Sequence, residues 1–471
     1  MTSPKKRQAV VIIHGIGEQR PMKTLRGFVE SILNYEKAAH GDSKADLKKR
    51  TYWTKPDRIN DSYELRKISS RGRPGVRSTT HFYEYHWAAN MRDTTMGHVL
   101  KWFRSLMVRN PLIGHWRIWI LWILLWVGSG FWFYQILAVV ADNLHIENLQ
   151  EIGIDGWQWG FVILPLLFMI FSKVMVYYIG DAARYLRVDV NNIAEREAIR
   201  KNGVSLLKAL HKSEDYDRIV LVGHSLGSVI AYDIITYLWI EFNKAINLEA
   251  KDEVCESDNN WGLEFGSLKL GDPDIAELLK HSSSESKDQL CEDKPVNIQT
   301  VQTNVWNKVR NGRRGWLISD LVTLGSPLSH ANLLMADNQE DFEKRINERE
   351  YPVCPPLKDG TNYSYKNGDG QRFMHHATPF AGTRWTNLYY GGDFIGGKVA
   401  PLFGPGVNDV KVHYTRYWWD KIISEIWFMT HNGYWKEKCD PSTIKSKKEY
   451  ETIGNLYSAM RLDDIAKSIY K

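Results

Sequence analysis

Alternation between apolar and polar segments divides the chain into short strands and longer helices. Residues 8–13 (QAVVII) form an apolar, β-branched run typical of a buried strand, and residues 81–87 (HFYEYHW) alternate as a second or third strand would. A helical stretch is predicted over 23–39, and an amphipathic helix over 191–210. Strands alternating with helices predict an α/β fold with a mainly parallel sheet covered on both faces.

The second half of the chain continues this alternation after a polar interruption. Residues 247–296 are polar and rich in serine, and we expect an irregular insertion or a mobile cap there. A strand ending in a small-residue turn is predicted at 317–327 (LISDLVTLGSP). Another strand, followed by a glycine-flanked loop, is predicted at 384–397 (RWTNLYYGGDFIGG).

Two long apolar segments interrupt the pattern. Residues 118–140 carry no charged side chain, and 157–179 carry only Lys173, so each is long enough to cross a bilayer core. The connection between them is acidic, whereas Lys and Arg flank the pair. The positive-inside rule therefore predicts a two-span transmembrane hairpin with the rest of the protein on the cytoplasmic side. The alternative is a buried helical hairpin in a soluble protein.

Composition narrows the classes of partner and cofactor. The net charge of +6 is small and its basic residues are dispersed, so no nucleic-acid footprint is present. The four cysteines form no CxxC pair, which argues against a zinc site or a disulfide framework and suits a reducing compartment. Nineteen tryptophans and 23 tyrosines favour a membrane–water interface. No metal or cofactor is expected.

The segment with the clearest chemistry is 218–227, RIVLVGHSLG. An apolar strand runs directly into Gly-His-Ser-Leu-Gly, and the apolar run SVIAYDII follows at once, which predicts a strand, a sharp turn and a helix with Ser225 at the turn. Glycines two positions before and after the serine allow the neighbouring elements to approach closely. This geometry is that of a nucleophile elbow, which exposes a serine hydroxyl beside the amides of a helix N-terminus.

Three motifs in order resemble the α/β-hydrolase superfamily: HGIGEQ at 14–19, the elbow GHSLG, and TLGSP at 323–327. The match is closest to a lipase- or esterase-like branch of membrane-associated bacterial serine hydrolases. The resemblance covers most of 8–240 and 315–436, with the hairpin and the polar segment as insertions. It implies an α/β-hydrolase-type sheet and a Ser–acid–His triad in that chain order.

On that order, Ser225 is the nucleophile, Asp393 the acid and His431 the base. Asp393 follows a short strand, and its flanking glycines leave room for a close approach. His431 lies in a polar turn, THNGYW, after an apolar stretch, and His413 is the alternative base, within VKVHY. Asp320 is set aside because it sits before its strand, at the wrong edge of the sheet.

The resemblance also implies an oxyanion hole built from backbone amides. One donor is the N–H of Leu226, directly after the nucleophile, and the other comes from Ile16 or Gly17 in the HGIG turn. Backbone donors require no particular side chain, so the glycines there serve close approach.

Together these features predict a membrane-anchored serine hydrolase that cleaves carboxylic esters, with a lipid or lipid-like ester as substrate. An acyltransferase on the same fold and a catalytically silent hydrolase-fold scaffold at the membrane are the alternatives. The chain is expected to divide into an N-terminal part of the core, the hairpin, the elbow part, the polar insertion or cap, the C-terminal part of the core, and a basic tail or helix: 1–100, 101–180, 181–246, 247–315, 316–436 and 437–471.

Overall fold

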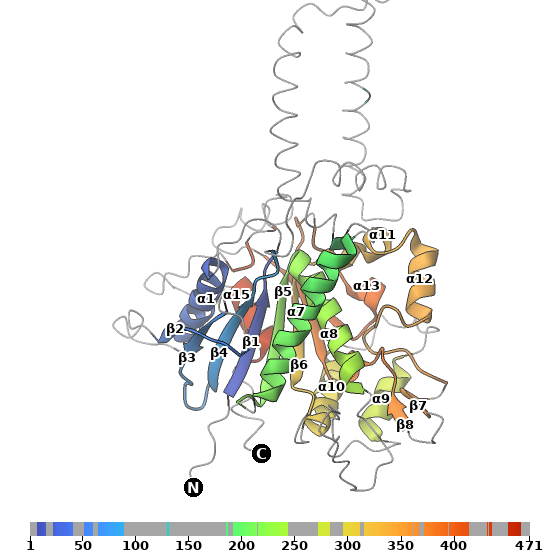
Figure 1. Cartoon of the computed structure of the whole chain (residues 1–471), viewed down its shortest axis with the longest axis horizontal. Coiled ribbons are helices and arrows are strands. Elements are labelled where there is room, and N and C mark those ends of the chain that lie inside the picture. The colour runs from blue at the N-terminus through green and yellow to red at the C-terminus, as the bar shows by residue number, and fades with distance from the viewer. Residues whose placement is uncertain are drawn as a thin grey trace, which may run out of the picture.

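The computed structural model places a central β-sheet between two layers of helices (Figure 1). The residues that it describes are 7–15, 22–40, 51–59, 65–88, 130, 185–186, 192–213, 215–243, 272–282, 295–310, 315–360, 362–366, 372–393, 395–413, 431, 433–435 and 451–462.

Eight strands form the main sheet, in the spatial order β10-β9-β6-β5-β1-β4-β3-β2. The six strands from β4 to β10 in this order run parallel to their neighbours, and β3 and β2 are antiparallel additions at one end. The α/β class and the mainly parallel sheet predicted from the sequence are therefore confirmed. The strands are β1 (Arg7–Ile13), β2 (Tyr52–Pro56), β3 (Arg66–Ser70), β4 (Thr79–Tyr85), β5 (Arg218–His224), β6 (Ile318–Leu324), β9 (Arg384–Tyr390) and β10 (Val407–Val412).

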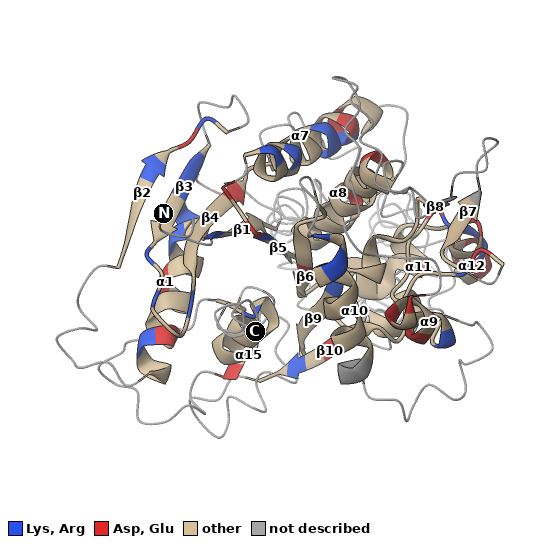
Figure 2. Cartoon of the chain, turned by 90° about the horizontal axis from the view of Figure 1, so that it is seen from below, with Lys and Arg blue, Asp and Glu red and all other residues tan. Residues whose placement is uncertain are grey.

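The pleat of the buried strands supplies two separate cores. In β1, Val10 and Ile12 face a layer formed by α1 (Lys23–Ala39) and α15 (Glu451–Met460), whereas Val11 and Ile13 face the opposite layer. That second layer contains α7 (Ile193–Lys212), α8 (Leu226–Asn243) and α10 (Pro295–Val309). Figure 2 shows α7 and α8 on one side of the sheet and α1 and α15 on the other. Burial on both faces explains why these strands read as continuous apolar runs.

The elbow strand β5 lies at the centre of the sheet, between β1 and β6. The helix that follows it, α8, packs against α7 through a close approach at Gly203, where a Cβ would lie 2.2 Å from Cδ1 of Ile234. Tyr85 of β4 donates a hydrogen bond to the backbone oxygen of Ile199 in α7. These contacts fix the helix that carries the nucleophile turn against the sheet.

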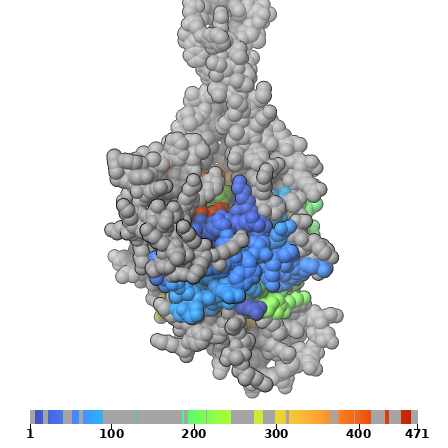
Figure 3. Space-filling model, turned by 90° about the vertical axis from the view of Figure 1, so that its left-hand side faces the viewer, coloured from blue at the N-terminus to red at the C-terminus, as the bar shows by residue number. Residues whose placement is uncertain are grey.

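Strands β2 and β3 extend the sheet beyond β4 as an antiparallel pair, next to α1. Tyr52–Pro56 pairs with Arg66–Ser70, and its side chains are only partly buried. Figure 3 views the molecule from this side, where the N-terminal elements, in blue, form most of the described surface.

Shorter elements cover the β9 and β10 end. Within the segment expected to be irregular, residues Pro273–Lys280 form the helix α9, which Asp272 caps by accepting a hydrogen bond from the backbone N–H of Asp274. Over these residues the chain is helical and not irregular, with a Pro in the first turn and an Asp cap at its start, and the alternative of a mobile cap stays a prediction. The remaining elements are η6 (Pro327–His330), α11 (Ala331–Leu334), α12 (Gln339–Asn347), β7 (Ser364–Lys366), β8 (Arg372–Met374), η7 (Pro379–Ala381) and α13 (Ala400–Phe403).

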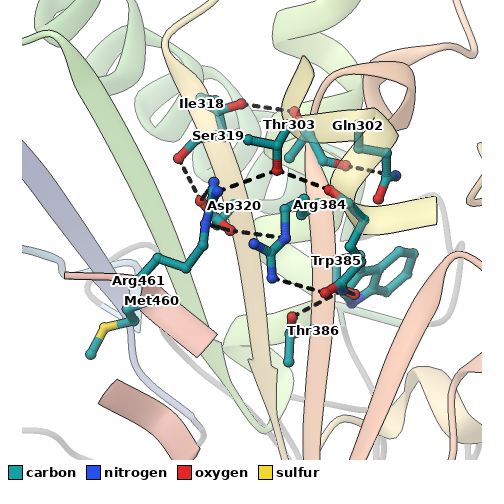
Figure 4. A network of polar contacts seen from close by, with 12 residues as sticks. Gln302, Thr303, Ile318, Ser319, Asp320, Arg384, Trp385, Thr386, Met460 and Arg461 are labelled. Carbon is teal, nitrogen blue, oxygen red and sulfur yellow. Dashed lines mark hydrogen bonds and ion pairs between the residues drawn. The ribbon is translucent and has the colours of Figure 1, made fainter. Parts of the chain in front are cut away.

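A buried ionic network ties α15 to the amino end of the sheet (Figure 4). Asp320 accepts hydrogen bonds from Arg218 at 2.5 Å and from Arg461, just after α15, at 2.9 and 3.1 Å. Arg384 lies 3.6 Å from the same carboxylate. Asp320 is the third residue of β6 and not a residue before it, but it does lie at the edge opposite the elbow, as expected.

The two apolar segments predicted to form a membrane hairpin, 118–140 and 157–179, lie outside the described residues apart from Gly130. Within the described part of the chain, none of the helices combines the length and apolar character that crossing a membrane requires.

Candidate active site

Ser225 occupies a backbone conformation that few non-glycine residues adopt. Its φ is +52°, in the left-handed region, at the junction between β5 and α8. This is the sharp strand-to-helix turn that the sequence predicts. Such strain persists only where the surrounding structure holds it in place, and it is concentrated at functional sites.

The glycines on either side of Ser225 are required sterically. A Cβ at Gly223 would lie 2.5 Å from Cα of Ser228, and one at Gly227 would lie 2.2 Å from the backbone oxygen of Ile13. The first contact closes the turn, and the second lets α8 pack directly on the end of β1. Both glycines of Gly-x-Ser-x-Gly are therefore required, because the backbone of another segment lies too close to each for a side chain to fit.

Hydrogen bonds hold the elbow in position from the neighbouring strand. The N–H of Ser225 donates to the backbone oxygen of Leu324 at the end of β6. The carbonyl of Ser225 accepts the hydroxyl of Ser228 at 2.5 Å, and that hydroxyl also lies 2.6 Å from Oγ of Ser326 in the TLGSP turn. The TLGSP motif thus supports the nucleophile turn.

The hydroxyl of Ser225 itself has no protein partner among the described residues. The residue is 1% exposed, and no hydrogen bond reaches Oγ from that part of the chain. A buried hydroxyl without a partner is costly, so its presence in a strained turn indicates a functional group.

The His-Gly turn at the end of β1 lies directly beside Ser225. A Cβ at Gly15 would lie 2.8 Å from Cβ of Ser225. The preceding side chain, His14, is buried, stacks on Trp87, and lies with Nδ1 2.8 Å from the carbonyl oxygen of Gly15. Burial lowers the pKa of His14 to about 4, against the opposing effect of that hydrogen bond. His14 is thus neutral at pH 7, and Nδ1 carries the proton that it donates.

Asp393 lies in the loop after β9, and donors surround its carboxylate. Oδ1 accepts hydrogen bonds from the backbone N–H groups of Ile395 and Gly396, at 2.9 and 3.0 Å. Oδ2 accepts the hydroxyl of Tyr434 at 2.7 Å. Burial by itself would raise the pKa of Asp393, but the charge of His431 and these donors hold it well below its usual range. The carboxylate is therefore ionised although it is buried.

His431 is hydrogen-bonded to this carboxylate through one ring nitrogen. Nδ1 lies 3.0 Å from Oδ1 and 2.9 Å from Oδ2 of Asp393. Because an ionised carboxylate only accepts, Nδ1 carries the proton, and in the neutral ring Nε2 is the acceptor. Nε2 is buried and has no partner within the described part of the chain. An oriented histidine with an open Nε2 is the arrangement that a general base requires.

The rings of the elbow and the base loop are in contact. His224, which precedes Ser225, stacks on His431 with ring centroids 5.0 Å apart. Nε2 of His224 donates to the backbone oxygen of His431 at 2.9 Å. His224 thus links the loop that carries His431, the predicted base, to the turn that carries Ser225; this loop is called the base loop below.

The other predicted site residues have mixed outcomes. Leu226 is the first residue of α8, so its N–H has no acceptor within the helix, and its role as an oxyanion donor stays a prediction. Ile16 and Gly17 lie outside the described residues. His413 follows the last residue of β10, and its carbonyl accepts a hydrogen bond from Thr452, whereas the contact with Asp393 is made by His431.

Sequence reasoning missed two residues that shape the site. Tyr434 lies in the THNGYW turn that carries His431, and its hydroxyl reaches Asp393. Gly325 in TLGSP has φ +53°, and a Cβ there would lie 2.7 Å from both Oδ2 of Asp393 and Cε2 of Tyr434. Both residues stand in motifs that the sequence analysis quotes, but their partners come from distant segments, so no local signal identifies them.

A metal-dependent mechanism finds no candidate ligands in the described residues: no group of three or more His, Cys, Asp or Glu side chains converges there. Cys354 is a buried thiol, and burial raises its pKa to about 12, which makes it a poor nucleophile.

Comparisons with known proteins add nothing to this geometry: no protein-family model, no curated protein and no solved structure matches the chain.

Proposed function

We propose that the chain is a serine hydrolase of the α/β-hydrolase type that cleaves carboxylic esters through an acyl-enzyme on Ser225. The observation that carries the proposal is a pair of buried atoms with no partner in the described residues, Oγ of Ser225 and Nε2 of His431. One belongs to a strained elbow, and the other to a histidine oriented by a buried carboxylate. Each atom supplies what the other needs, because a serine hydroxyl is a nucleophile only when a base accepts its proton.

In the proposed mechanism, Nε2 of His431 accepts the proton of Ser225 as Oγ attacks the acyl carbon. The tetrahedral oxyanion is stabilised by the N–H of Leu226 and by a second amide of the HGIG turn. The histidine then protonates the leaving alcohol. Water, deprotonated by the same nitrogen, releases the acid and regenerates the serine. Asp393 keeps the proton on Nδ1 and stabilises the charged imidazolium.

A lipid or lipid-like ester at a membrane is the proposed substrate. This part rests on the sequence alone, namely on the uncharged segment 118–140, its apolar companion 157–179 and the Lys and Arg residues that flank them. A two-span anchor would keep the hydrolase at the cytoplasmic face of the bilayer, where its substrate is concentrated.

Covalent labelling with a fluorophosphonate tests the proposal. Membranes carrying the wild type, Ser225→Ala, His431→Ala and His413→Ala are treated with the probe. We expect labelling to be lost in Ser225→Ala, to fall by several orders of magnitude in rate in His431→Ala, and to persist in His413→Ala. Absence of labelling in a folded wild type would favour a catalytically silent scaffold, and labelling that survives Ser225→Ala would place the nucleophile elsewhere.

A further inference from the structure

The base loop carries a second polar side chain that reaches the acid. Tyr434 is fully buried, only three residues after His431, and its hydroxyl donates to Oδ2 of Asp393 at 2.7 Å. His431 contacts the same oxygen at 2.9 Å. One carboxylate oxygen is therefore shared between the base and the tyrosine.

The direction of the tyrosine hydrogen bond is fixed by a second contact. The backbone N–H of Tyr390, the last residue of β9, donates to the hydroxyl oxygen of Tyr434 at 3.1 Å. A backbone N–H can only donate, so the tyrosine oxygen is the acceptor there and its own proton is left for Asp393. Burial beside Asp393 raises the pKa of Tyr434 well above its usual range, so the hydroxyl stays protonated.

Close packing around the Tyr434 ring holds its hydroxyl in this position. Gly325 and Gly396 both lie against the carboxylate, because a Cβ on them would lie 2.7 and 2.8 Å from Oδ2 of Asp393, and Gly325 also touches the Tyr434 ring. The ring packs on Tyr390 with centroids 4.7 Å apart. His224 approaches the Tyr434 ring from the elbow, at 5.7 Å. Tyr434 is thus clamped between the TLGSP turn, the end of β9 and the elbow.

We propose that Tyr434 is a positioning residue for the proposed reaction: its hydroxyl fixes the orientation of the Asp393 carboxylate and withdraws charge from the oxygen that faces His431. The inference rests on the proposed function. By taking part of the carboxylate charge, the tyrosine limits how readily the Asp393–His431 pair takes up a proton, and so keeps Nε2 available as a base at lower pH.

The test replaces Tyr434 by Phe, with Tyr390→Phe as the matched control. The hydroxyl of Tyr390 pairs with that of Thr452 at 2.9 Å, and its ring belongs to the same apolar cluster as the Tyr434 ring. The control therefore loses one buried hydroxyl near the site but keeps the hydrogen bond from Tyr434 to Asp393. The measurement is kcat/KM for a soluble short-chain ester as a function of pH, with the concentration of active enzyme taken from fluorophosphonate titration.

For Tyr434→Phe we expect a fall of about tenfold in kcat/KM at pH 7, the order of one charge-assisted hydrogen bond. We also expect the acidic limb of the profile to move to higher pH by about one unit, because the pair takes up a proton more readily without the donor. Tyr390→Phe should keep the wild-type limb. His224, which stacks on His431, is present in both variants, so its own charge does not account for a difference between them.

The outcomes separate the two proposals. A wild type that the probe does not label overturns the proposed function itself. An active wild type whose Tyr434→Phe variant retains the same acidic limb overturns the positioning role, even if that variant is less stable. A limb that moves equally in both variants assigns the effect to packing and also contradicts the inference.

Discussion

Two buried aspartates at opposite edges of the sheet have the same charge state and different surroundings. Asp320, at the amino end of β6, is compensated by Arg218, Arg461 and Arg384. Asp393, in the loop after β9, is held by neutral donors and one histidine. In both cases burial would raise the carboxyl pKa, and the neighbours hold it well below its usual range.

The difference lies in what each network leaves over. Around Asp320, the charges of three arginines join α15, β5 and β9 to β6. Around Asp393, the histidine keeps one buried nitrogen without a partner in the described residues, and the hydroxyl of Ser225 in the neighbouring elbow is in the same condition. A network of paired charges stabilises the fold. A network that leaves a buried acceptor nitrogen without a hydrogen-bond partner is a candidate for proton transfer.

The largest effect is expected from Asp393→Asn. The asparagine cannot stabilise the imidazolium or hold the proton on Nδ1, so kcat/KM for an ester should fall by about 10³–10⁴-fold. The thermal midpoint should also fall, because the buried donors around the side chain lose the ionised carboxylate that accepts their hydrogen bonds. Steady-state kinetics together with thermal unfolding check this, and a variant that is active but unstable would show that the two aspartates are alike.

Asp320→Asn should lower the stability of the fold and leave the activity unchanged. Removing the carboxylate leaves Arg218 buried beside Arg461 without a counter-charge, at a cost of about 3–5 kcal/mol in the free energy of unfolding. Urea denaturation measures this, and kcat of the folded fraction should match the wild type. As a control, Asp341→Asn breaks an aspartate–arginine pair on the surface of α12 and should have little effect on unfolding. Equal stability of the two variants would contradict the role assigned to Asp320.

Gly325→Ala should lower both stability and activity. The left-handed φ of +53° and the contact of a Cβ with Asp393 and Tyr434 together imply a loss of about 1–3 kcal/mol in unfolding free energy. Gly360→Ala is the matched control, because Gly360 has φ +61° but an open Cβ position. The control should show the backbone cost alone, with normal kcat. A Gly325→Ala variant with normal kcat would contradict a role of the TLGSP turn in positioning Asp393.

The smallest effect concerns acid stability. Both carboxyl groups have lowered pKa values in the folded protein, so each contributes stability that is complete above the unfolded pKa of about 4 and is lost as the pH falls below it. The unfolding free energy should therefore decline below about pH 4, and the slope should be shallower in Asp320→Asn by up to about one proton. Urea titrations at several pH values measure the slope, and an unchanged slope would contradict the linkage.

Much of the fold follows from local pattern. The strand predicted at 8–13 and the helix at 23–39 are confirmed as β1 and α1, because buried parallel strands and amphipathic helices have strong periodic signals. No such signal predicts strand β2. Its sequence, YWTKP, is half-exposed and ends in proline at the sheet edge, so it lacks the alternation that marks a buried strand.

Two parts of the candidate site could be predicted from the sequence, one from a compact motif and the other from the order of residues along the chain. The elbow conformation of Ser225 is confirmed, and the expected contact between Asp393 and His431 is present, although their catalytic roles stay predictions. Tyr434 and Gly325 could not be found in this way. Their importance arises from contacts between the base loop, the acid loop and the TLGSP turn, which only the folded sheet brings together.

The separation of the site residues along the chain also determines when each of them is synthesised. Gly15 and Ser225 meet across neighbouring strands, but His431 leaves the ribosome more than two hundred residues after the serine. At about 5–20 residues per second this interval lasts roughly 10–40 seconds. During that time the growing chain carries its elbow without the base, and long-range parallel pairing is still incomplete. A nascent chain that stops before residue 431 would thus carry Ser225 without the histidine that we propose as its base.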